Sequence, residues 1–397
     1  MEWKEVDICQ LCDSVSETYK GNASEVVLIN TSDVLDGKCL NHEYVPNKKL
    51  KGQFKKTFRK GDILYSEIRP ANKRFCFVDF EPKDYIASTK LMILRAHEDI
   101  DPQYLYQILR SNDTLTQLQM LAESRSGTFP QITYSELSNI MVSLPSQKAQ
   151  KNIVSILASL DRKIELNNKI NADLEEMAQA IFKNWFVDFE PFKNGKFVDS
   201  ELGMIPKGWK VGTLTEIASY MNGLAMQKFP PENNEDSLPV LKIKELGQGF
   251  CGTDSDRCSC NIKDECKIHN GDVIFSWSGT LLVDVWCGGD CGLNQHLFKV
   301  TSKDYPKWFY YYWTKHHLQE FIHIAKDKAV TMGHIKRGHL EEAMVAIPDN
   351  DSMEKAHELF EPILSKMISL RLENSRLSLL RDTLLPRLMS GKLEVPQ

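Results

Sequence analysis

Between residues 146 and 186, apolar side chains recur in alternating steps of four and three residues. The stripe runs from Ile153 to Trp185, and Asn167 and Asn171 occupy its two central positions. Lys, Glu, Asp and Gln are frequent at the positions in between. A stripe this narrow can be covered only by a partner helix. The pattern therefore predicts a helix of about 36 residues, roughly 54 Å long, that pairs with a second helix.

A second stripe with the same spacing runs from Phe360 to Leu388, with Asn374 near its middle. Two such stripes can bury each other within one chain, and an antiparallel arrangement would bring the central Asn side chains together. A buried Asn fixes the register of a helix pair at some loss of stability. The alternative is that each helix lies on the surface of its own domain. The residues expected to pair are Leu160, Ile164, Asn167, Asn171, Leu174, Met367, Leu370, Asn374 and Leu377.

The segments that precede the two stripes, 1–145 and 208–348, have patterns of short strands and helices, with one helix expected over 102–121. They also repeat each other. Residues 60–66 match 270–276, and 128–145 align without a gap on 331–348. A repeat near 200 residues indicates a duplicated domain. The predicted organisation is a first domain at 1–145, a helix at 146–186, a connector at 187–207, a second domain at 208–348, and a helix with a tail at 349–397.

This order predicts the fold class. Two mixed α/β (α+β) domains are separated by two long antiparallel coiled-coil helices, and the duplication gives the chain approximate twofold symmetry.

Composition adds only weak constraints on the fold and the function. With 397 residues, 42% hydrophobic and 26% charged, the chain has room for two or three folded domains. The net charge of −5 argues against a polycation, so nucleic-acid binding would depend on local basic faces. The N-terminal residues lack the features of a signal peptide, and the sequence has no apolar stretch of membrane-spanning length. We therefore expect a cytoplasmic protein whose ten Cys are reduced.

The duplicated layout, together with several short motifs, resembles the specificity subunit of type I restriction-modification systems. The resemblance covers nearly the whole chain, and its specificity lies in the order of the motifs. They occupy 150–186, ending Ala-Ile-Phe-Lys-Asn-Trp-Phe, and then 203–209, 271–280, 293–298 and 384–391.

The resemblance implies a non-catalytic chain that recognises DNA. Each domain would be a target-recognition domain that reads one half of a split, asymmetric site. The paired helices would set the spacing and dock two methyltransferase subunits, and a separate restriction (motor) subunit would cleave. S-adenosylmethionine, ATP and Mg²⁺ would then be bound by the partner subunits.

Reading bases requires donors and acceptors on loops, such as Arg for guanine and Asn or Gln for adenine, whereas Lys and Arg neutralise phosphates. Residues 48–60 hold seven Lys or Arg and no acid. The alternatives are structural turns and caps, and for 48–60 a solvated hairpin. Candidates in the first domain are Lys55, Lys56, Arg59, Arg69, Lys73, Arg74, Arg125, Thr128 and Gln131. Candidates in the second are Trp277, Ser278, Asn294, Gln295, His296, Lys326 and His334.

Two further patterns suggest ligands that we do not predict. Residues 247–252 fit G-x-G-x-x-G, but the polar segment that follows predicts a loop and not the helix that a dinucleotide site needs. Among six Cys near His269, only the last two have the spacing of a zinc knuckle, so no metal site is assigned. These six are Cys251, Cys258, Cys260, Cys266, Cys287 and Cys291.

Asp62, Glu81 and Lys83 resemble the acids and lysine of a metal-dependent nuclease. In the second domain only the Asp recurs, as Asp272, so we interpret both Asp residues as caps of a turn that leads into a strand. A nuclease, and a coiled-coil interaction scaffold that makes no DNA contact, remain as alternative functions.

Overall fold

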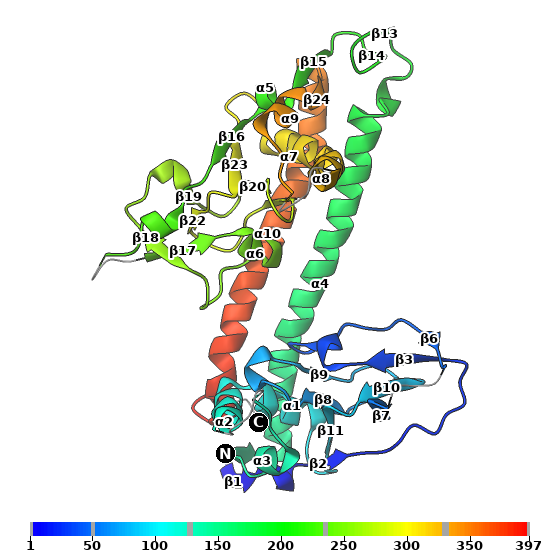
Figure 1. The fold of residues 1–397 in the computed structure, drawn as a ribbon, viewed down its shortest axis with the longest axis vertical. Coiled ribbons are helices and arrows are strands. Elements are labelled where there is room, and N and C mark those ends of the chain that lie inside the picture. Colours follow the sequence, from blue (N-terminus) through cyan, green and yellow to red (C-terminus); the bar gives the residue numbers. More distant parts are fainter. Residues whose placement is uncertain (1–2, 49–51, 125–129, 233–236, 328–332, 395–397) are drawn as a thin grey trace. The chain divides into compact units, whose positions relative to one another are not determined.

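The computed structural model describes residues 3–48, 52–124, 130–232, 237–327 and 333–394 (Figure 1). Its contacts divide the chain into two compact units. Unit 1 is Met1–Arg162 with Leu377–Gln397, and unit 2 is Lys163–Arg376. The predicted first and second domains lie in units 1 and 2, respectively.

Unit 1 is built around two four-stranded sheets. One has the order β2-β11-β8-β9 and is antiparallel throughout. The other has the order β6-β3-β10-β7, and its central pair, β3 and β10, is parallel. The strands of the first are β2 (Cys12–Val15), β11 (Leu91–Ala96), β8 (Ile63–Ser66) and β9 (Phe75–Phe77). Those of the second are β6 (Val45–Pro46), β3 (Glu25–Ile29), β10 (Tyr85–Ser88) and β7 (Phe54–Lys56).

Smaller elements complete unit 1. A two-stranded sheet pairs the start of the domain with its end, and a short hairpin precedes β6. These strands are β1 (Trp3–Asp7) with β12 (Met141–Pro145) and β4 (Val34–Leu35) with β5 (Lys38–Cys39). The helices are α1 (Pro102–Arg110), α2 (Asn112–Glu123) and α3 (Tyr134–Ser138).

The single helix predicted over 102–121 is therefore wrong. Ser111 has an extended backbone (φ −62°, ψ 147°), and its hydroxyl accepts the backbone N–H of Thr114. This side chain caps a second helix, α2, in place of continuing the first.

Unit 2 repeats this plan strand for strand. Its antiparallel sheet has the order β16-β23-β20-β21, and its second sheet, β18-β17-β22-β19, again contains a parallel central pair. The strands of the first are β16 (Ser219–Asn222), β23 (Leu297–Thr301), β20 (Val273–Ser276) and β21 (Leu282–Val285). Those of the second are β18 (Arg257–Ser259), β17 (Ser237–Leu241), β22 (Cys291–Leu293) and β19 (Lys267–Ile268).

Unit 2 also has the two-stranded sheet between the start and end of its domain, and a hairpin lies in the connector. These strands are β15 (Lys210–Thr213) with β24 (Met344–Ile347) and β13 (Phe197–Val198) with β14 (Ile205–Pro206). The helices are α5 (Leu214–Ile217), α6 (Ile243–Gln248), α7 (Lys307–His316), α8 (Leu318–Asp327) and α9 (Arg337–Glu342). The predicted duplication is thus confirmed by sheet topology.

The matched sequences 60–66 and 270–276 form the same turn into the same strand. Gly61 and Gly271 have φ values of 90° and 92°, a conformation that favours glycine. The next residue in each, Asp62 or Asp272, accepts the backbone N–H of the residue three positions earlier. The interpretation of both Asp side chains as turn caps is confirmed.

Two long helices follow the domains: α4 (Gln147–Phe186) and α10 (Asn350–Met389), each of 40 residues. Both helices pass from one unit into the other along the chain. Neither these helices nor any other in the described residues is long and apolar enough to cross a membrane.

Within unit 2, α4 and α10 contact each other through polar side chains of their stripes. Asn167 is fully buried, and its amide donates to Asn374 at 2.9 Å and to Glu373 at 2.8 Å. Farther along α4, the ring of Phe182 lies 6.2 Å from that of Phe360. Because later residues of α4 meet earlier residues of α10, the two segments run antiparallel in this unit.

The stripe residues lie on the covered side of the helices. Asn167, Asn171, Met367 and Leu370 are buried, and the others are partly buried: Leu160, Ile164, Leu174, Asn374 and Leu377. In unit 1, the ends of the same helices are joined by an ion pair between Asp161 and Arg381 at 2.8 Å.

Candidate nucleic-acid interface

Six of the seven candidates in the second domain lie together at one end of β20. Ser278 follows this strand, and its hydroxyl lies 3.1 Å from Nδ1 of His296, which immediately precedes β23. Gln295 lies beside the other ring nitrogen of His296, at 3.3 Å. Ser278 also forms a β-bridge with His334. The grouping brings three segments that are distant in sequence to one place.

Trp277 forms the apolar part of this group. Its ring centroid lies 6.0 Å from that of His296 and 6.4 Å from that of His334. The indole N–H is buried, and it has no hydrogen-bond partner within the described part of the chain. An indole ring beside two imidazoles offers flat surfaces and nitrogen groups, which are suited to contact with bases.

Asn294 has a structural role in the same group. It is buried, its backbone N–H donates to the carbonyl of Leu241, and its side-chain oxygen accepts the N–H of His296. It therefore holds the turn that presents Gln295 and His296. A Cβ on Gly223 would come 2.2 Å from the carbonyl oxygen of Leu293, so only glycine lets the neighbouring segment pack against this turn.

Lys326 lies apart from this group in sequence, on α8. Its side chain is exposed, and the structure describes no contact between it and the group. It could act only as a separate phosphate contact.

Unit 1 has the same backbone arrangement at the matching end of β8. The N–H of Ile132 donates to the carbonyl of Glu67, as that of Ile335 donates to Trp277. The N–H of Arg69 donates to Pro130, as that of Gly279 donates to Gly333. Gln131 bridges to Ile68 as His334 bridges to Ser278. The candidates Arg69 and Gln131 therefore occupy the place that corresponds to the group in unit 2.

Two other candidates of the first domain have donors already engaged. The ammonium of Lys56 donates to the carbonyls of Thr89 (3.2 Å) and Leu91 (2.8 Å), and burial lowers its pKa. The guanidinium of Arg74 donates to the carbonyl of Ser32 at 3.0 Å. These groups hold loops and strands of unit 1 in place, which reduces what they can offer to a phosphate.

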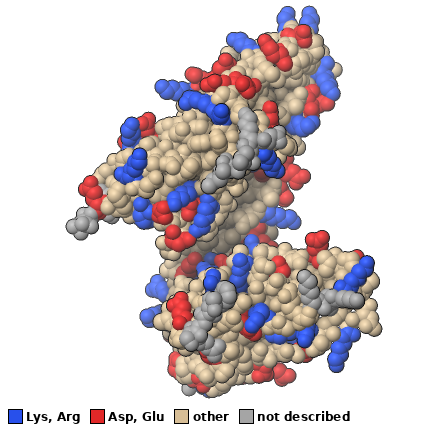
Figure 2. All heavy atoms as spheres, in the orientation of Figure 1, with Lys and Arg blue, Asp and Glu red and all other residues tan. Residues whose placement is uncertain are grey.

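The remaining basic candidates are free to reach solvent. The side chains of Lys55, Arg59 and Lys73 are exposed. On the face that Figure 2 shows, Lys and Arg side chains are dispersed among Asp and Glu and do not form one continuous patch. Arg125 and Thr128 lie outside the described residues, as do positions 49–51 of the basic run.

Lys90 is a candidate that sequence reasoning missed. Leu91 pairs with Ser66 in unit 1, and Leu297 pairs with Ser276 in unit 2, so Lys90 corresponds to His296. Its ammonium lies 3.6 Å from a carboxylate oxygen of Glu67, which corresponds to Trp277. The internal repeat could have identified this residue. If the match between 60–66 and 270–276 is extended to the strands that pair with β8 and β20, Lys90 falls at the position of His296.

The geometry does not support the nuclease alternative. Asp62 is 1% exposed, and both its carboxylate oxygens accept from the guanidinium of Arg95 at 2.8 Å. Asp272 makes a similar pair with Lys299 at 2.8 Å. A carboxylate held in this way neutralises a strand cation, and no described contact joins Asp62 to Glu81 or Lys83.

The glycine-rich segment at 247–252 begins in the last residues of a helix and continues as a loop, where the sequence predicted a loop. Helix α6 ends at Gln248, and Gly249 caps it with φ 82°. The phosphate site of a dinucleotide fold requires a helix that begins at the glycines, so this loop lacks the required geometry. Among the described residues, no group of three or more His, Cys, Asp or Glu has an arrangement that could hold a metal ion.

Comparison with known proteins identifies the family. The model for the type I restriction modification DNA specificity domain matches twice, at residues 2–176 and 206–374. The chain belongs to this family, and its two matches coincide with the two structural repeats. Its function is therefore the recognition of DNA sequence, and it is a non-catalytic subunit, as the sequence predicted.

Individual relatives are similar to this chain over nine-tenths or more of its length. The specificity subunit of the type I restriction enzyme HindI of Haemophilus influenzae is 29% identical, over 99% of this chain and all of that one. The MjaIX specificity subunit of Methanocaldococcus jannaschii is 28% identical, over 90% of this chain and 85% of that one. The solved S subunit from M. genitalium, at 15% identity, covers 98% of this chain and 96% of its own with a TM-score of 0.52, a likeness of fold.

Proposed function

We propose that the chain reads a split, asymmetric DNA site, one half with the domain at 1–145 and the other with the domain at 208–348. The observation that carries the proposal is the equivalent placement of two different residue groups. Trp277 and His296 in unit 2 occupy the backbone positions of Glu67 and Lys90 in unit 1. Two domains with one backbone and different side chains would read different bases.

In this proposal, the residues that contact bases differ from those that contact phosphates. In the second domain, Gln295, His296 and His334 contact base edges, Trp277 supplies an apolar surface, and Lys326 binds a phosphate. In the first domain, Arg69 and Gln131 contact bases beside Lys90, while Lys55, Arg59 and Lys73 bind phosphates. Such phosphate contacts add affinity without sequence information.

The two long helices are the spacer in the proposal. They form an antiparallel coiled coil, and the duplicated units give the chain approximate twofold symmetry. A helix of 40 residues is about 60 Å long, which exceeds one turn of DNA at about 34 Å. Support comes from the buried Asn167–Asn374 contact, because a buried Asn fixes one register of a helix pair. A fixed register would give a fixed number of unread base pairs.

The helices also provide a surface for partner subunits. Leu166, Ile170 and Met177 of α4 are exposed, at 49%, 42% and 46%, and their spacing of four and seven residues places them along one face. An exposed apolar face of this kind is typical of a binding surface. We assign it to two methyltransferase subunits, with a restriction subunit joining the complex. The relatives are named as specificity subunits of type I restriction enzymes, which supports assembly with other subunits. S-adenosylmethionine, ATP and Mg²⁺ then belong to those partners, in the cytoplasm.

The test is to map methylated adenines in cells that carry this chain with its methyltransferase. The expected result is one bipartite motif with a constant gap. Replacing residues 208–348 with the corresponding domain of a relative should change one half of the motif and leave the other half and the gap unchanged. A contiguous motif, or a swap that changes both halves, would contradict the proposal.

A second experiment separates the proposal from its alternatives. The purified chain, incubated with DNA, Mg²⁺ and S-adenosylmethionine, should produce neither nicks nor methyl groups, whereas a nuclease would produce nicks. With the methyltransferase added, the complex should shift a duplex that contains the motif in a gel at low salt. A complex that assembles without binding this duplex would favour a coiled-coil scaffold that makes no DNA contact.

A further inference from the structure

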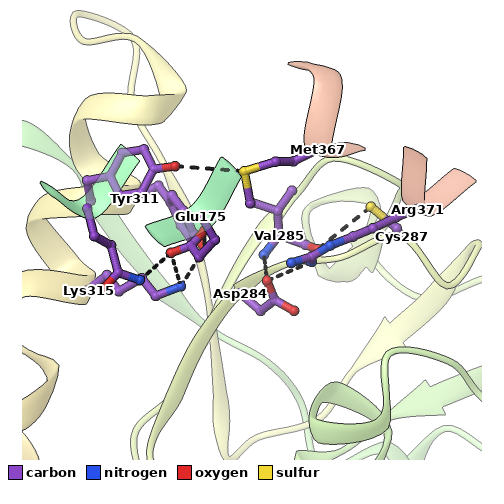
Figure 3. A network of polar contacts seen from close by, with 10 residues as sticks. Glu175, Asp284, Val285, Cys287, Tyr311, Lys315, Met367 and Arg371 are labelled. Carbon is purple, nitrogen blue, oxygen red and sulfur yellow. Dashed lines mark hydrogen bonds and ion pairs between the residues drawn. The ribbon is translucent and has the colours of Figure 1, made fainter. Parts of the chain in front are cut away.

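The helix that follows β23 is joined to α4 by a partly buried ion pair (Figure 3). The ammonium of Lys315, on α7, lies 2.5 Å from a carboxylate oxygen of Glu175, on α4. The exposed fractions are 24% for Lys315 and 18% for Glu175. Lys315 also donates to the hydroxyl of Tyr311 at 3.0 Å, and that hydroxyl donates to Glu175 at 3.5 Å. Three polar groups thus hold α7 against α4 in one orientation.

A second link joins the sheet of the same domain to α10. The guanidinium of Arg371 donates to Asp284, on β21, at 2.7 Å and to the carbonyl of Val285 at 3.0 Å (Figure 3). Burial disfavours the charge of Arg371, but the attraction and hydrogen bond of Asp284, with attraction to Tyr311 and Cys287, together outweigh it and raise the pKa of the guanidinium. The second domain is therefore joined separately to both long helices.

Apolar contacts hold the same elements together without fixing their angle. The ring of Trp308, on α7, stacks on that of Phe360, on α10, at 4.7 Å, and Phe182 of α4 packs against Trp313. Hydrophobic attraction is not directional, so packed rings permit small rotations. Charge-assisted hydrogen bonds lose strength quickly with angle and distance, so they select one rotation.

Unit 1 contains a corresponding set of contacts. Arg110, at the end of α1, lies 3.5 Å from Asp161 of α4, which also binds Arg381 of α10 at 2.8 Å. Arg110 lies over the ring of Tyr106, four residues earlier, as Lys315 lies over Tyr311. The pairing of aromatic residue and cation recurs on the corresponding helix, although the acids and bases are distributed differently. The recurrence makes an incidental surface contact a poor explanation.

We propose that these ion pairs are positioning residues that set the rotation of each recognition domain on the long helices. Through that rotation they determine which number of unread base pairs the protein accepts between the two half-sites. The inference rests on the proposed function, since it assumes a split site. It assigns Glu175, Lys315, Asp284 and Arg371 to spacing and not to base recognition.

The test uses the full chain in complex with its methyltransferase. Glu175→Gln and Arg371→Gln each remove one link while keeping side-chain size close to the original. The DNA duplexes carry the mapped half-sites with the native gap, or with one base pair more or fewer, a change of about 3.4 Å along the helix axis. The readout is the methylation rate on each altered gap divided by the rate on the native gap.

The expected result is that both variants raise this ratio several-fold and leave the base preference of each half-site unchanged. Lys193→Gln is the matched control, because it breaks an exposed ion pair with Glu190 in the connector. The control should keep the ratio of the unaltered chain. An unchanged ratio in the folded Gln variants, or an altered base preference, would overturn the proposal.

If a Gln variant does not fold, a charge-reversed variant tests the proposal in its place. Glu175→Lys combined with Lys315→Glu restores an ion pair of opposite polarity and should restore the strict gap preference; a relaxed preference in this variant contradicts the proposal. Failure of the unaltered complex to methylate a bipartite motif would instead refute the proposed function, so the two failures are distinguishable.

Discussion

Nδ1 of His296 lies 3.1 Å from the hydroxyl of Ser278, and this contact joins the turn before β23 to the loop after β20. The corresponding segments of unit 1 are joined by an ion pair, in which the ammonium of Lys90 lies 3.6 Å from a carboxylate oxygen of Glu67. One backbone framework therefore presents an imidazole in one unit and an ammonium in the other. An imidazole accepts or donates, whereas an ammonium only donates, so the two positions favour different base edges.

The first prediction concerns the imidazole. His296→Ala removes a group that can bond to a base edge and leaves the turn in place, because Asn294 accepts the backbone N–H at this position. We expect discrimination in one half-site to fall by about 1–3 kcal/mol at one base pair. The measurement is competitive binding of the complex to duplexes altered at each position of both half-sites.

Lys90→Ala, at the corresponding place in unit 1, is the matched comparison. It should weaken discrimination in the opposite half-site only. If both substitutions affect the same half-site, or if His296→Ala weakens binding equally for all sequences, then His296 contacts the backbone or acts through folding and not as a reader of bases.

The second prediction concerns the fold of unit 1. Asp62→Ala leaves the guanidinium of Arg95 without its main partner and removes the cap of the turn at Gly61. Loss of one member of a buried ion pair is expected to lower the free energy of unfolding by about 3–5 kcal/mol. Urea unfolding followed by circular dichroism measures this change.

Glu17→Ala provides the control, because Glu17 also pairs with Arg95, at 2.9 Å, but is 57% exposed. An exposed ion pair contributes about 0–1 kcal/mol, so this variant should resemble the unaltered chain. Equal destabilisation by the two substitutions would show that burial of Asp62 is not what makes its pair with Arg95 important.

The third prediction distinguishes two Asn residues on the same helical stripe. The side-chain oxygens of Asn167 and Asn171 are both buried without a partner among the described residues, but the amide N–H₂ of Asn167 also donates two hydrogen bonds, to Glu373 and Asn374. Asn171→Leu should therefore raise the free energy of unfolding by about 1 kcal/mol, and Asn167→Leu should lower it by a similar amount. Thermal unfolding of the two variants measures both signs, and a shared sign would contradict the contact assignment.

The long helices were predictable because their signal is local. Their apolar spacing depends only on the period of an α-helix, and α4 begins and ends within one residue of the predicted 146–186. The duplication was also predictable, since Gly61–Asp62 recurs as Gly271–Asp272 at the start of a matching strand. In contrast, the break at Ser111 required a choice between continuing one helix and capping another. Propensity alone does not decide that choice.

Roles that depend on tertiary contacts could not be inferred. Nothing near Lys56 in sequence indicates that its ammonium binds the carbonyls of Thr89 and Leu91. Asn294 was likewise a reasonable base reader until the structure placed its oxygen on the N–H of His296. Donors and acceptors are the same chemical groups in both roles, so only the neighbouring strands distinguish a structural residue from a binding residue.

The last prediction concerns pH. His316 lies at the end of α7 with its ring 5.3 Å from that of His317 and 5.5 Å from that of Trp313. Much of the His316 side chain is exposed, but the packed rings partly desolvate its imidazole. This desolvation, with repulsion from His317 and Lys183, lowers its pKa below the ordinary value of 6.5, against the opposing effect of Glu320, and solvent screening keeps the contribution to stability small. The folded state thus holds this imidazole neutral at a pH where the unfolded chain protonates it.

It follows that the free energy of unfolding of unit 2 decreases as the pH falls from above 6.5 toward the lowered pKa. Urea unfolding at pH 7.5 and at pH 5.5 should show this loss, and His316→Gln should reduce it. His323→Gln, which changes an exposed histidine of α8, should keep the pH dependence of the unaltered chain. An identical loss of stability in the His316→Gln variant would mean that other groups, such as carboxylates, account for the acid sensitivity.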